Sequence, residues 1–189
     1  MNHILATHYG IVKKEVVQRA TQIRLLICDV DGVLSDGRIY MGNQGEELKS
    51  FHIHDGYGIR CLKNAGIEVA LITGRSSQIV KDRALTLGID YLYQGVIEKL
   101  IPYRELLSLL SLNDQQVAYI GDDLIDWPVM QKVGLSVAVS NAYPWLLKKA
   151  HYVTYTSGGH GAIRELCDLI LLAQKKLKRD KESFIYMKK

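Results

Sequence analysis

An apolar run that ends in two carboxylates constrains this chain more than any other stretch. Residues 25–28 read Leu-Leu-Ile-Cys, and Asp29 and Asp31 follow two positions apart, with Gly32 directly after them. The short apolar run predicts a buried strand, at whose end carboxylates are costly to place without a partner. Oxygen ligands side by side suit Mg²⁺, which takes few protein carboxylates and binds substrate phosphate oxygens as well. The stretch therefore favours a magnesium-assisted phosphoryl-transfer site, although an isolated Asp-x-Asp pair is more often a solvated turn.

The composition indicates a single globular domain spanning residues 1–189. The chain has 189 residues, of which 48% are hydrophobic and 23% charged, enough to bury a real core. Apolar runs stay far below the roughly 20 residues that span a bilayer, and the first ten residues lack the pattern of a secretory signal, so a cytoplasmic protein is expected. The three cysteines show no Cys-x-x-Cys spacing. Buried thiols are thus expected rather than a disulfide framework or a zinc site.

The positive charge lies at the two ends of the chain. Residues 175–189 carry +5 and residues 1–24 carry +3, so the net charge of +4 leaves residues 25–174 at −4. A nucleic-acid-binding protein would more often carry a basic face on its folded body. Neither nucleic acid nor a membrane is expected as a partner, and the basic ends are interpreted as solvated segments or as arms that reach an anionic site.

Strands and helices alternate regularly along the chain, which predicts an α/β fold with a doubly wound parallel sheet. After a leading helix over residues 11–20 and the strand over 25–30, residues 36–53 alternate around Gly42-Asn43-Gln44-Gly45 as a β-hairpin does. A helix over 56–65 follows. The later predicted strands are 68–72, 91–93, 117–120, 136–139 and 152–154, and the later predicted helices are 76–87, 98–110, 124–133, 144–150 and 162–178. This alternation builds a parallel sheet that is covered by helices on both faces.

Polar residues gather where the predicted strands end. Ligands bind such sheets beyond the carboxyl ends of the strands. The residues that this rule collects are Asp29, Asp31, Thr73, Gly74, Arg75, Asp122, Asp123 and Asp126, with Lys99 opening the helix between them. Taken singly, each has a plain alternative: a turn, a solvated lysine, a helix N-cap or a first-turn acid. Those alternatives do not explain why all of them occur together at one sheet edge.

The chemistry that these residues can perform is the hydrolysis of a phosphate monoester. Asp29 can attack phosphorus as the nucleophile, and Asp31 can protonate the leaving oxygen and later deprotonate water. The Thr73 hydroxyl and the Gly74 amide can donate to the phosphoryl group, and Lys99 can neutralise it. In addition, Asp122 can complete the metal shell, while Asp123 and Asp126 lie behind it, with Asp126 able to orient that shell or the lysine.

Two levels of resemblance sharpen this interpretation. Asp-Val-Asp-Gly-Val-Leu, Thr73, Lys99 and Gly-Asp-Asp-x-x-Asp resemble the four ordered motifs of the haloacid dehalogenase superfamily. Over about residues 9–177 the chain further resembles one of its families, the 3-deoxy-D-manno-octulosonate 8-phosphate phosphatases. The motifs that carry this likeness are Ser35-Asp36-Gly37, residues 42–49, residues 55–60, residues 121–130, Gly158-Gly159 and Arg164-Glu165.

The resemblance implies an enzyme without a cap domain that depends on Mg²⁺ and forms a homotetramer. It would release phosphate from 3-deoxy-D-manno-octulosonate 8-phosphate through an aspartyl-phosphate, in lipopolysaccharide biosynthesis. It further implies that Asp29, Asp31 through its carbonyl, and Asp122 hold the metal. Gly74, Arg75, Asp55, His54 and His160 are expected at the substrate. Here His54 and His160 stand where arginine or another basic residue is expected, so two permanent cations become groups only partly charged near neutrality. A phosphatase for a nine-carbon acid sugar phosphate is therefore the alternative within the enzyme class.

The spacing of the motifs agrees with the absence of a cap. Asp31 and Thr73 are 42 residues apart and Thr73 and Lys99 are 26 apart, whereas a separate domain needs on the order of 50 or more residues. The lid must then come from another chain, with the hairpin as the natural element for oligomerisation. The tail over residues 180–189 holds Phe184-Ile185-Tyr186-Met187, and the resemblance implies that it reaches a neighbouring site.

Two other classes of protein compete with this interpretation. A signalling receiver domain also joins acidic residues, a Thr and a Lys on a parallel sheet, but its phosphorylated Asp follows the third strand. Here no Asp follows residues 91–95, and the acidic cluster comes after Lys99. A non-catalytic interaction protein built on this fold would have no need for both Asp29 and Asp31.

Overall fold

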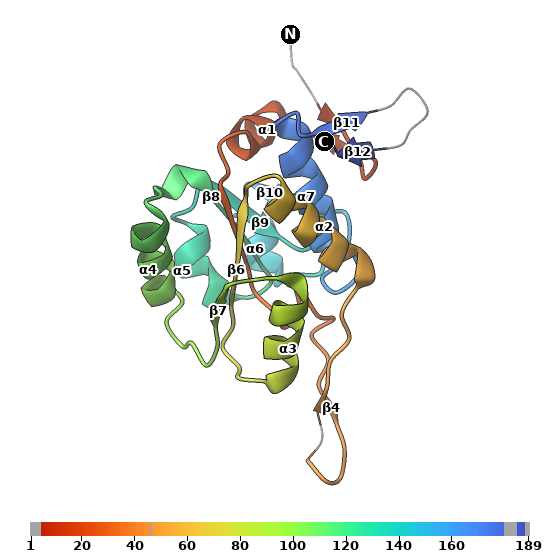
Figure 1. The fold of residues 1–189 in the computed structure, drawn as a ribbon, viewed down its shortest axis with the longest axis vertical. Helices are drawn as coiled ribbons and strands as arrows, with labels where there is room; N and C mark the ends of the chain where they lie inside the picture. Colours follow the sequence, from red (N-terminus) through yellow and green to blue (C-terminus); the bar gives the residue numbers. More distant parts are fainter. Residues whose placement is uncertain (1–4, 46, 180–184, 188–189) are drawn as a thin grey trace.

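A six-stranded parallel sheet forms the centre of the fold in the computed structural model, which describes residues 5–45, 47–179 and 185–187 (Figure 1). The strands lie in the order β10 (Tyr152–Val153), β9 (Leu135–Ala138), β8 (Val117–Gly121), β3 (Leu25–Cys28), β6 (Glu68–Ile72) and β7 (Tyr91–Tyr93). Strand β3 pairs in parallel with β6 on one side and with β8 on the other. The predicted α/β class with a parallel sheet is confirmed.

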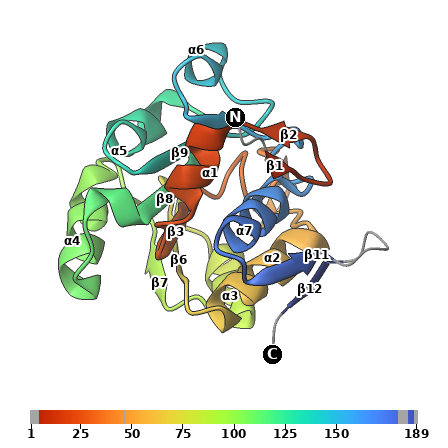
Figure 2. The same ribbon diagram turned by 90° about the horizontal axis from the view of Figure 1, so that it is seen from above.

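Helices cover both faces of this sheet (Figure 2). On one face α2 (Ile53–Asn64) packs against α7 (Ala162–Ala173), with α3 (Gln78–Leu87) beside α2 and α1 (Lys14–Ala20) against α7. On the other face lie α4 (Leu100–Leu110) and α5 (Trp127–Met130), which contact each other. The short α6 (Pro144–Leu147) connects β9 and β10. No helix in the described residues has the length and apolar character required to cross a membrane.

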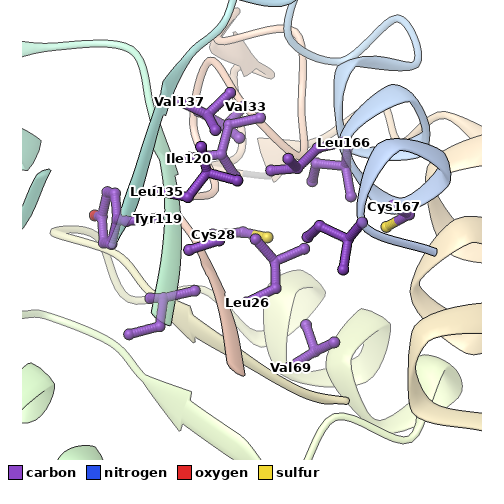
Figure 3. Packing of buried hydrophobic residues seen from close by; sticks show 14 of the residues in the cluster. Leu26, Cys28, Val33, Val69, Tyr119, Ile120, Leu135, Val137, Leu166 and Cys167 are labelled. Carbon is purple, nitrogen blue, oxygen red and sulfur yellow. The ribbon is translucent and has the colours of Figure 1, made fainter. Parts of the chain in front are cut away.

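The core lies between the sheet and the helices. All four residues of β3 are buried, because a strand covered on both faces has no solvated side. Figure 3 shows Leu26 and Cys28 turned toward Leu166 and Cys167 of α7. The three cysteines are buried free thiols, as the sequence predicts.

Each predicted helix differs from the observed one in at least one bound. The smaller differences are that α3 begins at Gln78 rather than at residue 76, α4 begins at Leu100 rather than at 98, and α6 ends at Leu147 rather than at 150. Residues 11–12 form β2 (Ile11–Val12), paired with β1 (Leu5–Ala6), so the leading helix begins only at Lys14. The helix predicted from residue 56 begins at Ile53. The helix predicted over 124–133 is a 3₁₀ turn (Leu124–Asp126) followed by α5, which ends at Met130. The last helix ends at Ala173 rather than at residue 178, because Lys175 adopts a left-handed backbone conformation (φ 57°) that no α-helix continues through.

Besides β1 and β2, two more antiparallel strand pairs lie outside the sheet, at opposite ends of the molecule (Figure 1). Strands β4 (Tyr40–Met41) and β5 (Glu47–Leu48) form the predicted hairpin between β3 and α2, which projects from the body. Its apolar side chains Ile39, Met41 and Leu48 are 54%, 78% and 66% exposed. Beyond α7, β11 (Leu177–Arg179) pairs with β12 (Ile185–Met187). The rest of the predicted tail, residues 180–184 and 188–189, lies outside the described residues.

Candidate active site

A pocket of about 200 Å³ opens at the carboxyl ends of β3, β6 and β8. Its lining residues are Asp29, Asp31, Thr73, Gly74, Arg75, Lys99, Asp122, Asp123 and Ile125. Parallel strands end at a common edge, so residues 29 and 122, distant in sequence, become neighbours. All of the lining residues except Ile125 are among those that the sequence collects at this edge.

Lys99 is the central cation of the pocket. Lys99 is only 2% exposed, and its Nζ donates to Asp29 Oδ1 and to Asp126 Oδ1, each at 2.7 Å. Burial works against the ammonium charge, but the two carboxylates outweigh it and raise the pKa of Lys99. The lysine is therefore a permanent positive charge that is held against the proposed nucleophile.

Asp126 is the acceptor that organises the far side of the site. It is fully buried, and besides Lys99 its carboxylate accepts from the Tyr119 hydroxyl at 2.6 Å. It also accepts from the backbone amides of Asp122 at 2.9 Å and Asp123 at 3.2 Å. With four donors on two oxygens, Asp126 is satisfied by the protein itself.

The negative charges of Asp29 and Asp122 are less well balanced by protein donors than the charge of Asp126. One oxygen from each of Asp29, Asp122 and Asp126 lies within 4.8 Å of the others. Burial, followed by repulsion from Asp126, raises the pKa of Asp29 to about 8, although Lys99 opposes this. Burial and the charges of Asp126 and Asp123 raise the pKa of Asp122 to about 7. A second positive charge would relieve this crowding, and hard oxygen ligands of this kind fit a divalent cation such as Mg²⁺.

Glycines let the loops approach each other closely around the pocket. Gly32 has a φ of +88°, and a Cβ on it would lie 2.1 Å from Asp122 Oδ2. The loop before α7 touches the same segment, because a Cβ on Gly158 would lie 1.7 Å from the Gly32 carbonyl oxygen. In addition, the amide of Gly159 donates to the Val33 carbonyl at 2.8 Å. The Gly-Gly pair therefore supports the loop that carries Asp31.

Thr73, Gly74 and Arg75 line the β6 side of the pocket. Thr73 is buried, and its hydroxyl accepts from the amide of Arg75 at 3.4 Å. A Cβ on Gly74 would make only ordinary contacts. The Arg75 guanidinium donates to Glu47 of the hairpin at 3.3 Å and is 46% exposed. The hairpin thus reaches the rim of the pocket.

Three residues expected at the substrate lie outside this pocket in the single chain. His54 is exposed on the first turn of α2, and His160 is exposed beside α7, where its Nδ1 lies 2.8 Å from the Gly158 carbonyl. Asp55 is fully buried and accepts from the Arg164 amide at 2.7 Å. Burial raises the pKa of Asp55. The carboxylate therefore joins the starts of α2 and α7.

Sequence reasoning assigned no role to two polar residues that contact the site. Lys49 of the hairpin ion-pairs with Asp31, and Tyr119 of β8 donates to Asp126. Tyr119 stands two positions before Gly121-Asp122 in an apolar strand, and a buried tyrosine hydroxyl requires a partner. That requirement is a signal that could have found Tyr119. For Lys49 the sequence shows its place in an alternating hairpin and in the motif over residues 42–49, but neither indicates a role.

Comparisons with known proteins show which proteins the whole chain resembles. Residues 92–166 match the family model of haloacid dehalogenase-like hydrolases. Over 171 residues the chain is 67% identical to the 3-deoxy-D-manno-octulosonate 8-phosphate phosphatase of Yersinia pestis, covering 90% of this chain and 91% of that protein. It is 62% identical over 173 residues to the enzyme of the same name from Escherichia coli K12, covering 92% of each.

Solved structures show the same likeness in three dimensions. The crystal structure of the Yersinia pestis phosphatase superimposes with a TM-score of 0.92 at 65% identity, covering 93% of this chain and 95% of that one. The phosphatase from Moraxella catarrhalis, in complex with magnesium ion, phosphate ion and KDO, superimposes with a TM-score of 0.84. It is 42% identical and covers 86% of this chain and 93% of its own.

Proposed function

The chain belongs to the 3-deoxy-D-manno-octulosonate 8-phosphate (KDO 8-phosphate) phosphatases, a family of haloacid dehalogenase-like hydrolases, and we propose that it hydrolyses KDO 8-phosphate to KDO and phosphate. The observation that carries this proposal is that one pocket is lined by Asp29, Asp31, Thr73 and Lys99 together. KDO is the eight-carbon acid sugar of lipopolysaccharide, so the reaction belongs to lipopolysaccharide biosynthesis.

The proposed mechanism has two half-reactions. Asp29 attacks phosphorus, the bond from phosphorus to the sugar oxygen breaks, and the leaving oxygen takes a proton from Asp31. Water then attacks the aspartyl-phosphate after losing its proton to Asp31, which releases phosphate and restores Asp29. Throughout, Lys99, the Thr73 hydroxyl and the Gly74 amide balance the charge of the phosphoryl oxygens. The 2.7 Å contact of Lys99 with Asp29 supports this assignment.

The carboxylates support Mg²⁺ as the cofactor. Asp29 and Asp122 would hold the ion together with the Asp31 carbonyl, whereas Asp126 is already satisfied by four protein donors. Bound there, the ion supplies positive charge that draws the phosphate dianion toward the nucleophile. The relative from Moraxella catarrhalis was solved with magnesium and phosphate ions and KDO together.

We propose that His54 and His160 meet the anionic groups of the sugar at the edge of the site. The bond of His160 to Gly158 supports this, because that glycine packs on the loop carrying Asp31. Asp55 would act indirectly, by holding the starts of α2 and α7 together. Replacing either histidine by arginine should lower KM for an acid-sugar phosphate, whereas an unaltered KM in both variants would remove the histidines from the site.

We further propose a cytoplasmic homotetramer whose hairpins pack together. The exposed apolar side chains of residues 36–53 support this, because a monomer would leave them in water.

In the single chain β12 pairs with β11 at the end of the sheet away from the hairpin. A tail that covers an active site would therefore have to cover a neighbour's site. Deleting residues 181–189 should preserve the tetramer in light scattering yet change KM or product release, and unaltered kinetics would contradict the tail's role.

A panel of phosphate esters tests the proposed function directly. Phosphate release is measured with Mg²⁺ on KDO 8-phosphate, a nine-carbon acid sugar phosphate and glucose 6-phosphate, with Asp29→Asn as the inactive control. We expect kcat/KM to be highest for KDO 8-phosphate. A clear preference for the nine-carbon ester would reassign the substrate, and equal rates on all three would refute acid-sugar specificity.

A further inference from the structure

Lys49 is a buried cation on the returning arm of the hairpin, directly after β5. Its side chain is only 1% exposed, although the adjacent residues Leu48 and Ser50 are exposed. Its Nζ donates to Asp31 Oδ1 and lies 3.2 Å from Glu47 Oε1. A desolvated ammonium is costly unless it is paired, and these two carboxylates provide the pairing. The hairpin thus places a positive charge on the proposed acid/base residue.

This contact belongs to a chain of alternating charges across the pocket mouth. Glu47 Oε1 also accepts from Arg75 at 3.3 Å, so the order is Arg75, Glu47, Lys49 and Asp31. Arg75 follows β6, Glu47 and Lys49 belong to the hairpin, and Asp31 follows β3. The side chains of Glu47 and Asp31 are each 26% exposed, which places the chain of charges at the rim.

The contact leaves one oxygen of Asp31 available. Within the described part of the chain, Oδ1 accepts from Lys49 and no protein donor is hydrogen-bonded to Oδ2. A carboxyl group rotates about its bond unless a partner fixes it, and proton transfer requires the acid within hydrogen-bond reach of the leaving oxygen. Lys49 fixes the plane of the carboxyl group and leaves Oδ2 to carry the proton.

Building on the proposed phosphatase activity, we propose that Lys49 is a positioning residue that aims Asp31 Oδ2 at the leaving oxygen of the substrate. When the bond between phosphorus and the sugar oxygen breaks, its electron pair stays on that oxygen, which takes the proton of Asp31. Lys49 keeps its own protons throughout. The hairpin thereby contributes to the chemical step in addition to any part in assembly.

Comparing two leaving groups separates this role from a purely structural one. The alkoxide of KDO leaves poorly without a proton, whereas p-nitrophenolate needs little protonation. With saturating Mg²⁺, Lys49→Met should lower the ratio of kcat for KDO 8-phosphate to kcat for p-nitrophenyl phosphate about tenfold, which is part of the roughly 10²- to 10⁴-fold that general acid catalysis contributes. Lys49→Arg should restore most of the ratio. Lys63→Met is the matched control, because it removes an ion pair to Asp90 that lies away from the pocket.

A double variant tests whether Lys49 acts through Asp31. If it does, adding Lys49→Met to Asp31→Asn should leave the ratio as it is in Asp31→Asn alone, since coupled residues are not additive. Light scattering shows whether the variants assemble as the wild type does. Lys49→Gln serves as a second variant with the same expectation, in case the methionine variant does not fold.

Other results would overturn the proposal. An equal fall in kcat for both esters, or an effect confined to KM, would make Lys49 a structural or sugar-binding residue instead. Failure of the wild type to hydrolyse KDO 8-phosphate would refute the proposed substrate alone. The ratio would then be measured with the sugar phosphate that the enzyme does hydrolyse.

Discussion

Replacing Asp126 by asparagine removes one charge from the centre of the site while keeping its shape. The carboxylate is fully buried and accepts four hydrogen bonds. An asparagine can turn its one carbonyl oxygen toward the amides of Asp122 and Asp123. Its NH₂ group then faces the Lys99 ammonium and the Tyr119 hydroxyl, and both of those donors lose an acceptor.

The expected loss follows from these contacts. Each hydrogen bond to a charged group contributes about 1.5–3 kcal/mol, so two lost bonds cost about 3–6 kcal/mol. Part of this is offset, because Asp126 repels Asp29 and helps to raise its pKa. We therefore expect the free energy of unfolding to fall by about 3 kcal/mol, which lowers Tm by about 6–12 °C for a chain of this length. Lys99 loses half of its support, so kcat should fall about 10- to 100-fold.

Thermal unfolding followed by circular dichroism, together with steady-state kinetics, measures both effects. Asp123→Asn is the matched control, because Asp123 is exposed and asparagine is an equally good N-cap. The control should change the free energy of unfolding by less than about 0.5 kcal/mol. If Asp126→Asn melted within 2 °C of Asp123→Asn, the hydrogen bonds of Asp126 would contribute much less to the free energy of unfolding than we expect.

Further predictions concern the nucleophile, the acidic cluster, the loop contact and the hairpin. Asp29→Asn should abolish both turnover and aspartyl-phosphate formation, and Asp31→Asn should lower turnover; more than a tenth of wild-type activity in Asp29→Asn would exclude Asp29 as the nucleophile. Burial and neighbouring acids raise the pKa of Asp29 to about 8 and that of Asp122 to about 7, from an ordinary 3.8. Between the ordinary pKa and the raised pKa of each group, the folded state therefore binds more protons than the unfolded state. Metal-free protein should thus lose stability as pH rises from about 5 to 8, and Mg²⁺ should raise Tm more at pH 8 than at pH 6; a melting series without that trend would contradict the crowding of carboxylates. Gly158→Ala should lower both Tm and kcat, because its Cβ would lie 1.7 Å from a backbone oxygen in the loop after β3, whereas wild-type kinetics would mean that the loops separate easily. Met41→Glu should dissociate the proposed tetramer in light scattering while leaving the melting of the single chain nearly unchanged; an intact tetramer would place the interface elsewhere.

The sequence alone determined the parallel sheet and the polar residues that meet at one edge of it. Apolar runs separated by helical segments specify buried strands in order, and parallel strands bring their carboxyl ends together. Asp29, Thr73 and Asp122 could therefore be assigned to one edge without coordinates, and the pocket contains all three. The ends of helices were less predictable. The left-handed backbone conformation of Lys175 ends α7, and a lysine in the sequence does not predict that conformation.

Only the tertiary structure decided how the polar groups are partnered. It showed that Asp126 is saturated by four donors, that Asp55 holds the start of α7, and that Lys49 reaches Asp31 across 18 residues of chain. Periodicity reports which face of an element is buried, because burial repeats along the chain with the backbone geometry. The partner of a buried charge depends on how separate loops pack in space, and the residues on either side of it in the sequence do not encode that distance.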